Sequence, residues 1–295
     1  MLEGLDISEV RFALVRTDTD KLRIDSGYYS KKYLQYLGDL HSLPCGLVTL
    51  GEMTTTLRKG VFDIKSESYV ESGIPFIRIS NLKNATIAEA NLAYISQEAH
   101  TKEYKTGLKR GDFVLSKTAY PAASLVTTKE CNASQDTIAC KLSSKASKIF
   151  DTKFIVIYLN SAPGLAVVER LFQGNVQLHL SLPDAATIPI PCLAIEFQKS
   201  IASVFNRSIE LSRQVKEFQR NSEDSLLGVL ELDGWQPPDS LTFEKSAIEA
   251  FSSGRIDAEF FQEKYQALED KLSEHFNLQE LVSLCTVTKG KTVPY

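Results

Sequence analysis

Residues 189–230 read PIPCLAIEFQKSIASVFNRSIELSRQVKEFQRNSEDSLLGVL, and the rest of the chain is organised around them. Pro189 and Pro191 mark the start, because proline lacks an amide hydrogen and continues neither a helix nor a central strand. Apolar residues then recur at alternating spacings of three and four, which is the heptad period of a helix that pairs with another helix. At ~1.5 Å per residue the predicted helix is about 50–60 Å long.

This helix is too long to form one wall of a small core, so we expect a spacer or an assembly strut. Serines interrupt the heptad positions and weaken it as a solitary coiled coil. An ordinary amphipathic helix lying on its own domain is the alternative. The residues predicted to pair with another helix are Ile201, Val204, Leu211, Val215 and Phe218.

Composition sets outer limits on the kind of protein. The 295 residues have room for about two domains, and 43% are hydrophobic, enough for real cores. The sequence contains no apolar run of about 18 residues and begins without a signal-peptide pattern, so we expect a cytoplasmic protein without a membrane partner. The five cysteines and four histidines are scattered, which favours reduced thiols and predicts neither a metal site nor a cofactor.

Charge is distributed unevenly along the chain. The whole sequence has a formal net charge of −4. Residues 47–190 contain 16 Lys and Arg against 13 Asp and Glu, a balance of +3, whereas residues 191–272 contain 9 against 15, a balance of −6. An acidic helical part beside a slightly basic globular part is compatible with one nucleic-acid-binding face.

The sequence also repeats itself. Residues 23–33 read RIDSGYYSKKY and residues 255–265 read RIDAEFFQEKY, so that Arg, Ile, Asp, two aromatics, Lys and Tyr coincide at an offset of 232. After a small gap, Leu47, Leu50, Met53 and Lys59-Gly60 resemble Leu278, Leu281, Leu284 and Lys289-Gly290. We therefore expect one complete unit of about 230 residues and the start of a second.

Between these repeats the pattern predicts an α+β fold with a mainly antiparallel sheet, followed by the long helix. Turn residues and alternation indicate strands at 74–80, 113–115 and 137–142, and a strand at 10–15 is also expected. Helices are expected at 28–40, 162–172 and 243–251, and the segment 154–159 is expected to be either a further strand or the opening of a helix. The predicted domains are an N-terminal arm (1–46), a globular domain (47–190), the long helix (191–232), and a linker with the second repeat (233–295).

Several enzyme signatures are missing from the sequence. It has neither the glycine-rich loop nor the Asn/Asp-Pro-Pro-aromatic tetrapeptide of an amino-methyltransferase, and it has no phosphate-binding P-loop. Asp136 with Asp151 and Lys153 could form a metal-dependent nuclease site, but the pattern is short and frequent by chance, so solvated surface charges are strongly favoured. We therefore expect no catalytic residues, with a nuclease as the less probable alternative.

An ordered set of short phrases identifies a family. GIPFIRISNL at 73–82, GDFVLSK at 111–117, NVQ at 175–177, LS at 180–181, IPIP at 188–191 and Glu196-x-Gln198 at the helix start resemble the DNA specificity (S) subunit of type I restriction-modification systems. The resemblance covers residues 20–232 and treats the remainder as the next repeat. One departure is Pro191-Cys192-Leu193, where the family has Pro-Pro-Leu.

The resemblance implies a non-catalytic role and a set of partners. Such subunits carry two target recognition domains, each reading half of a split DNA site, held apart by an antiparallel pair of long helices. They dock methyltransferase subunits, and a motor-nuclease restriction subunit joins for cleavage. With one complete recognition domain and one long helix here, we expect a homodimer on double-stranded DNA with a palindromic target. The alternative is a truncated assembly or regulatory subunit that competes for the methyltransferase.

The residues that would contact DNA are predicted from chemistry and expected loops, because side chains at groove edges read bases while basic groups position phosphates. The candidates share a polar or basic head group in or beside a turn. They are Arg58, Lys59, Arg78, Asn81, Lys83, Lys117, Thr118, Tyr120, Gln135, Asn175, Gln177 and His179.

Overall fold

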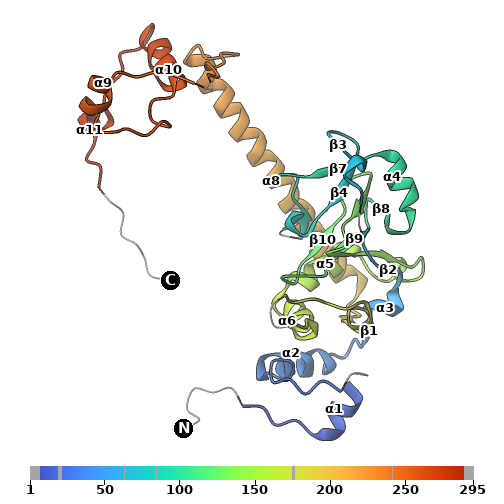
Figure 1. Cartoon of the computed structure of the whole chain (residues 1–295). Coiled ribbons are helices and arrows are strands. Elements are labelled where there is room, and N and C mark those ends of the chain that lie inside the picture. Colours follow the sequence, from blue (N-terminus) through green and yellow to red (C-terminus); the bar gives the residue numbers. More distant parts are fainter. Residues whose placement is uncertain are drawn as a thin grey trace. The chain divides into compact units, whose positions relative to one another are not determined.

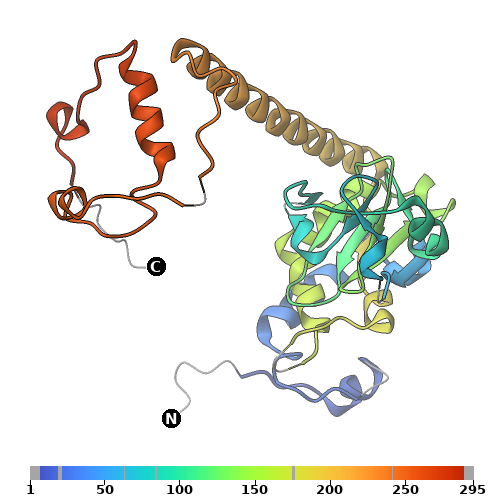
Figure 2. The same ribbon diagram turned by 45° about the horizontal axis from the view of Figure 1, so that its top comes forward.

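The computed structural model describes residues 7–18, 22–62, 64–83, 85–174, 177–240 and 242–288. The chain divides into two compact units, unit 1 (Met1–Ile209) and unit 2 (Glu210–Tyr295). The boundary falls inside helix α8 (Ile195–Val229), which Figures 1 and 2 show as one continuous helix. The long helix that the heptad pattern predicts is therefore confirmed.

Unit 1 is an α+β unit. Its helices are α1 (Phe12–Asp18), α2 (Lys31–His41), α3 (Leu50–Met53), α4 (Gln97–Lys102), α5 (Thr152–Asn160), α6 (Ala162–Leu171), α7 (Leu182–Ala186) and the first part of α8. Its strands are β1 (Leu47–Thr49), β2 (Thr54–Lys59), β3 (Tyr69–Val70), β4 (Ile74–Ile77), β5 (Leu82–Lys83), β6 (Thr86–Ile87), β7 (Ala93–Ile95), β8 (Leu108–Lys109), β9 (Phe113–Ser116), β10 (Ala123–Leu125), β11 (Glu130–Ala133), β12 (Thr137–Leu142) and β13 (Pro189–Pro191).

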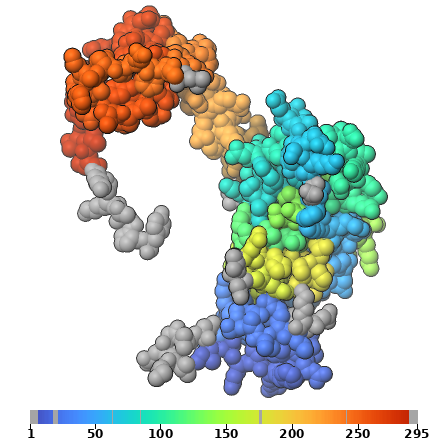
Figure 3. All heavy atoms as spheres, in the orientation of Figure 1, coloured from blue at the N-terminus to red at the C-terminus, as the bar shows by residue number. Residues whose placement is uncertain are grey.

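These strands form three sheets, ordered β2-β12-β9-β10-β6-β5, β3-β7-β4-β11-β8 and β1-β13. Only the β10–β6 and β11–β4 pairings among them are parallel, so the predicted α+β class with a mainly antiparallel sheet is confirmed. In Figures 1 and 3 the five-stranded sheet and α4 lie at one end of unit 1, and the N-terminal segment with α1 and α2 lies at the other.

The expected strand at 10–15 is wrong. The residues from Phe12 onward form helix α1, in which the Val15 amide donates to the Arg11 carbonyl at 3.3 Å. Val10, Phe12 and Leu14 alternate as in a strand, yet Phe12 is 72% exposed and Val15 is buried. Short apolar alternation does not separate a strand from one turn of helix.

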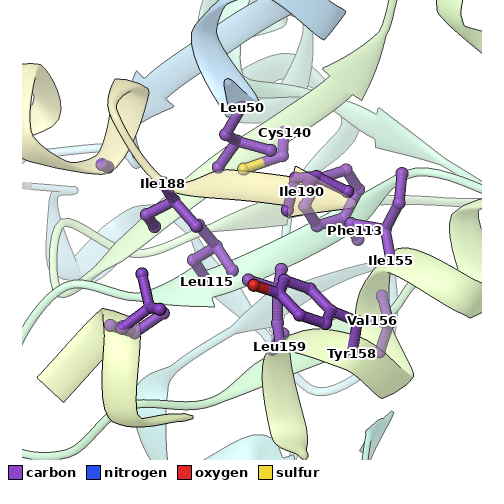
Figure 4. Close-up of a cluster of buried hydrophobic side chains, with 14 of the residues drawn as sticks. Leu50, Phe113, Leu115, Cys140, Ile155, Val156, Tyr158, Leu159, Ile188 and Ile190 are labelled. Atoms are coloured by element: carbon purple, nitrogen blue, oxygen red, sulfur yellow. The ribbon is translucent and has the colours of Figure 1, made fainter. Parts of the chain in front are cut away.

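The main core lies between the six-stranded sheet and helices α5 and α6 (Figure 4). Phe113 and Cys140 from the sheet meet Ile155 of α5 and Ile190 of β13, and all four are fully buried. Burial raises the pKa of the Cys140 thiol well above its usual value and that of Cys131 to about 12. These two thiols therefore behave as small apolar side chains.

No single helix in the described segments is long and apolar enough to cross a membrane. Helices α5 and α6 together meet the length and composition criterion, with a bend of 74° between them. Both contribute buried residues to the core of unit 1, including Ile155, Leu159 and Val167.

The side chain of Gln198 ties the start of α8 to the rest of unit 1 by hydrogen bonds. Gln198 is fully buried; its Oε1 accepts from the Asp151 amide at 2.9 Å, and its Nε2 donates to the carbonyls of Ile149 at 3.0 Å and Leu193 at 2.8 Å. Phe205, two turns on, is also buried. Beyond it Val215 is 53% exposed and Phe218 67% exposed, so the later heptad positions face solvent.

Unit 2 contains the rest of α8, α9 (Ala247–Ser252), α10 (Glu263–Ser273) and α11 (Leu281–Leu284). Helix α9 begins later than expected because Ser246 forms a capping box with Glu249. Helix α10 starts and ends 232 residues after α2, and α11 follows α3 by 231 residues. The two sequence repeats therefore form matching elements.

We predict that Gln198→Leu lowers the free energy of unfolding by about 2–4 kcal/mol, because leucine cannot replace the three hydrogen bonds of this buried side chain to the Asp151 amide and the Ile149 and Leu193 carbonyls. Urea unfolding monitored by circular dichroism measures this loss. Lys199→Leu, at an exposed neighbouring position of the same helix, is the matched control. Equal stability of the two variants would contradict the anchoring role.

Candidate nucleic-acid interface

The pairing of β12 brings several chain segments to one end of unit 1. The first residues of β12 lie opposite the last residues of its two neighbours: Ile138 is opposite Lys59 of β2, and Thr137 is opposite Ser116 of β9. The loops that follow β2 and β9 therefore leave the sheet beside the turn that precedes β12, residues 134–136.

The second sheet delivers a third loop to the same place. Strand β4 runs parallel to β11, with Ile77 opposite Ala133, and the Ser134 amide donates to the Ile77 carbonyl at 2.8 Å. Residues 78–80 therefore follow β4 next to residues 134–136. The chain after β2 approaches so closely that a Cβ on Gly60 would lie 2.1 Å from the Ser134 carbonyl oxygen, which only glycine permits.

A fourth and a fifth segment complete this end. The Lys117 amide donates to the Asp136 carbonyl at 2.8 Å, and the Tyr120 hydroxyl donates to the Ile79 carbonyl at 3.1 Å. Thr118 forms a β-bridge with His179. We call the resulting surface the strand-end face and define it as residues 58–62, 78–80, 117–120, 134–136 and 177–179.

The strand-end face has a charge opposite to that of the whole chain. Its residues include four cationic side chains, Arg58, Lys59, Arg78 and Lys117, and one carboxylate, Asp136, in a chain of net charge −4. Lys59 Nζ lies 4.5 Å from the ring centroid of Phe62, which is 67% exposed. A cation held against an exposed ring suits a contact with phosphate and sugar or base.

The amide and aromatic residues of the face differ in how freely they can reach a ligand. Gln177 and His179 are exposed, and Gln135 is half-buried. Tyr120 is 42% exposed. Arg78 is exposed, but its Nη2 donates to the Asn91 carbonyl at 2.6 Å, which holds the guanidinium in one direction.

Among the described residues, three of the sequence-predicted candidates do not offer an exposed side chain to this surface: Asn81, Thr118 and Lys83. Asn81 is 1% exposed; its Oδ1 accepts from the Arg78 amide, and its Nδ2 donates to the Ala88 and Ala90 carbonyls. Its polar side chain is used to build the 78–91 loop, so the expected DNA contact is replaced by a structural role. Thr118 is only 8% exposed.

Lys83 is exposed but lies elsewhere. Its strand β5 pairs with β6, which joins β10 at Leu125, opposite Phe113 at the start of β9. The strand-end face lies at the other end of β9. Asn175 falls outside the residues that the structure describes.

Sequence reasoning missed Phe62 and Ser80, which belong to the face. Phe62 lies three residues after Lys59, and an aromatic residue close to a basic pair is the signal that could have indicated it.

The alternative nuclease residues are separated. Asp136 lies beside the end of β9, whereas Asp151 and Lys153 line a hollow with Leu125 and Val126, toward the start of β9. The Asp151 carboxylate accepts from the Lys153 amide at 2.8 Å as the cap of α5. No group of three or more His, Cys, Asp or Glu residues able to hold a metal ion occurs within the described ranges.

Comparison with known proteins gives a fold-level match. No family model and no curated protein matches the sequence. Among solved structures, the S subunit of the type I restriction-modification system from M. genitalium is 16% identical, with a TM-score of 0.45, over 63% of this chain and 45% of that chain. The HsdS subunit from Thermoanaerobacter tengcongensis is 17% identical, with a TM-score of 0.40, over 71% and 50%.

The chain is structurally similar to type I specificity subunits. A third structure, of a type I R-M system, is 18% identical, with a TM-score of 0.43, over 74% of this chain and 53% of that chain. The chain spans about half the length of the specificity subunits that it matches. At these identities the likeness concerns the fold.

We predict that Asn81→Asp loosens the 78–91 loop, because a carboxylate keeps the acceptor for the Arg78 amide but faces the Ala88 and Ala90 carbonyls without a donor. Hydrogen exchange should rise in residues 78–91, and the free energy of unfolding should fall by about 1–3 kcal/mol. Asn91→Asp, at an exposed position, is the control. Equal exchange in both variants would contradict the structural role of Asn81.

Proposed function

We propose that this chain is a non-catalytic DNA-recognition subunit of a type I restriction-modification system, and that the strand-end face reads its half of the target site. The observation that supports this most directly is that the chain segments carrying Arg58, Lys59, Arg78 and Lys117 meet at one end of unit 1, in an otherwise acidic chain. The family resemblance of the sequence phrases points to the same role.

The chemistry of the face suits double-stranded DNA. Lysines supply phosphate contacts that position a protein without reading sequence. A glutamine side chain can form a bidentate pair with adenine, and an arginine with guanine, in the major groove. Gln135, Gln177 and Arg78 are therefore the proposed base-reading residues, and Lys59 and Lys117 the proposed phosphate contacts.

The exposed stripe of α8 is the second part of the proposal. Val204, Leu211, Val215 and Phe218 are each 44–71% exposed and recur at heptad spacings. An antiparallel pairing with α8 of a second copy would bury this stripe and relate two strand-end faces by two-fold symmetry, which makes the DNA target palindromic. The methyltransferase subunit and the motor-nuclease restriction subunit are the proposed further partners.

The exposed stripe also supports a second candidate, an assembly or regulatory subunit that competes for the methyltransferase without reading DNA. The two candidates differ in one property: only a DNA-recognition subunit discriminates between duplex sequences. Selection of bound duplexes from a random-sequence library, with sequencing, separates them.

We predict that Lys59→Ala and Lys117→Ala each weaken DNA binding roughly 5–10-fold near 0.1 M salt and reduce the slope of log K against log salt by about 1, since each removes one phosphate contact. Fluorescence anisotropy with the selected duplex, repeated at several salt concentrations, measures the affinity and the salt slope. Lys83→Ala, which removes the same charge outside the face, should leave affinity and slope unchanged. If Lys83→Ala weakened DNA binding as much as Lys59→Ala does, the assignment of the strand-end face as the DNA-binding surface would be contradicted.

We predict that the wild-type chain is a dimer at micromolar concentration and that Val215→Glu is a monomer, because the substitution places a charge in the paired stripe. Light scattering measures the mass. Arg220→Glu introduces the same side chain on the opposite side of α8 and should remain dimeric. A monomeric wild-type chain, or an unchanged mass for Val215→Glu, would contradict pairing through this stripe.

A further inference from the structure

The strand-end face is hollowed beside the turn at 134–136. The hollow has a volume of about 400 Å³, and its lining comes from the segment after β2, from β3, from the end of β4 and from that turn. Val61 forms a parallel bridge with Ser134, and the Val61 amide donates to the Ala133 carbonyl at 2.7 Å. Since the Ser134 amide also donates to the Ile77 carbonyl at 2.8 Å, backbone hydrogen bonds fix the turn to both neighbouring segments.

Part of the lining is apolar and aromatic. It consists of Val61, Ile64, Tyr69 and Phe76. Phe76 is 2% exposed and packs edge-to-face against Tyr69, with 5.9 Å between the ring centroids and 81° between the ring planes. Tyr69 itself is 42% exposed. A ring that packs on a buried neighbour and stays open to solvent is a platform on which a flat aromatic group can stack.

The polar part of the lining has hydrogen-bonding capacity to spare. Ser134 is 8% exposed, and its Oγ is buried without a hydrogen-bond partner. The side chains of Gln135 and Asp136 are half-buried, and neither has a hydrogen-bond or ion-pair partner among the described residues. A buried hydroxyl without a partner costs free energy, so the hollow is suited to a ligand with donors and acceptors of its own.

Asp136 also narrows the chemistry of that ligand. The cationic side chains of the strand-end face attract phosphates, whereas a carboxylate repels them. A carboxylate does accept from the N–H groups at the edge of a base. The Gln135 amide and the Ser134 hydroxyl can each both donate and accept. Together these three groups match the mixed donors and acceptors of a base edge and not a phosphate.

The size of the hollow agrees with this reading. A cavity of about 150 Å³ already holds a benzene ring, so about 400 Å³ has room for a base and part of its sugar. Arg78 also lines the hollow, with its guanidinium held by the Asn91 carbonyl, so a cation is present for the adjoining phosphate. Stacking on an aromatic ring combined with hydrogen bonds to the Watson–Crick edge is how proteins hold a base outside the duplex.

We propose that the hollow binds one nucleobase that is extruded from the duplex at the target site. The base stacks on Tyr69, and its Watson–Crick edge meets Ser134, Gln135 and Asp136. This inference rests on the proposed DNA recognition and adds a local distortion of the duplex to it. Extrusion costs the pairing and stacking of one base, and this cost depends on the sequence. The hollow therefore supplies specificity beyond that of groove contacts.

The test leaves each base of the selected duplex unpaired in turn, by placing an abasic residue opposite it, and measures affinity by fluorescence anisotropy. At the extruded position the wild-type chain should bind roughly 10-fold or more tightly than it binds the paired duplex, because the base pair is already broken. At other positions the abasic residue should leave the affinity unchanged or lower it. Either single strand alone should bind more weakly than the duplex.

Two tyrosine variants show whether this hollow holds the base. Tyr69→Ala removes the stacking platform and should reduce the gain at the extruded position to less than about twofold. Tyr104→Ala, at an exposed tyrosine outside the strand-end face, is the matched control and should retain the gain. If circular dichroism shows that Tyr69→Ala is unfolded, Asp136→Ala replaces it, because that carboxylate has no partner in the described part of the protein, and this variant should also reduce the gain.

The outcomes separate this proposal from the proposed function. If the wild-type chain binds the selected duplex but no position shows a gain, every base stays stacked and the hollow proposal is overturned, while DNA recognition stands. An equal gain for folded Tyr69→Ala and Tyr104→Ala would place the extruded base elsewhere and overturn it as well. Tighter binding of a single strand than of the duplex would identify single-stranded DNA as the ligand, again against the proposal. If no duplex is bound selectively, the proposed function fails and this inference fails with it.

Discussion

The register of β12 between β2 and β9 is the constraint on which the rest of unit 1 depends. It aligns Lys59, Thr137 and Ser116 at one end of the sheet, so the segment after β2, the segment after β9 and the turn before β12 all lie at that end. That turn, residues 134–136, connects β11 to β12. Because β11 pairs in parallel with β4, the segment after β4 lies at the same end. A one-residue slip would reverse which side chains face the core, so the core that fixes this register also positions the strand-end face.

The long helix and the longer strands were predictable because each carries its own period: heptads in α8 and apolar runs at 113–115 and 137–142. Strands β3, β5, β6 and β8 have two residues each, which is too short to show any period. Their places depend on pairing with distant segments, as for Leu125 opposite Thr86. The error at residues 10–15 has the same origin, since so short an apolar alternation fits a short helix as well as a strand.

The candidate site was predictable in composition but not in geometry. Turn chemistry correctly placed Lys117 and Gln135 in loops, whereas Arg58 and Lys59, expected in a turn, are the last two residues of β2. The strand register then brought these segments together. Asn81 has the same chemistry but is buried, because the loop at 78–91 needs its amide to satisfy backbone groups. Whether a polar side chain serves a ligand or its own loop is decided by burial, which depends on packing that sequence patterns do not encode.

The repeats show this division between local and tertiary information in one molecule. The arginine, aspartate and paired aromatics of each repeat form the same hydrogen bonds and ring geometry, so these contacts follow from local sequence alone. Burial of the rings differs, because the Arg170 guanidinium of α6 covers Tyr28, whereas Phe260 is 41% exposed and Phe261 is half-buried. Local sequence therefore sets the shape of each repeat, and packing against another helix decides how far its rings are removed from water.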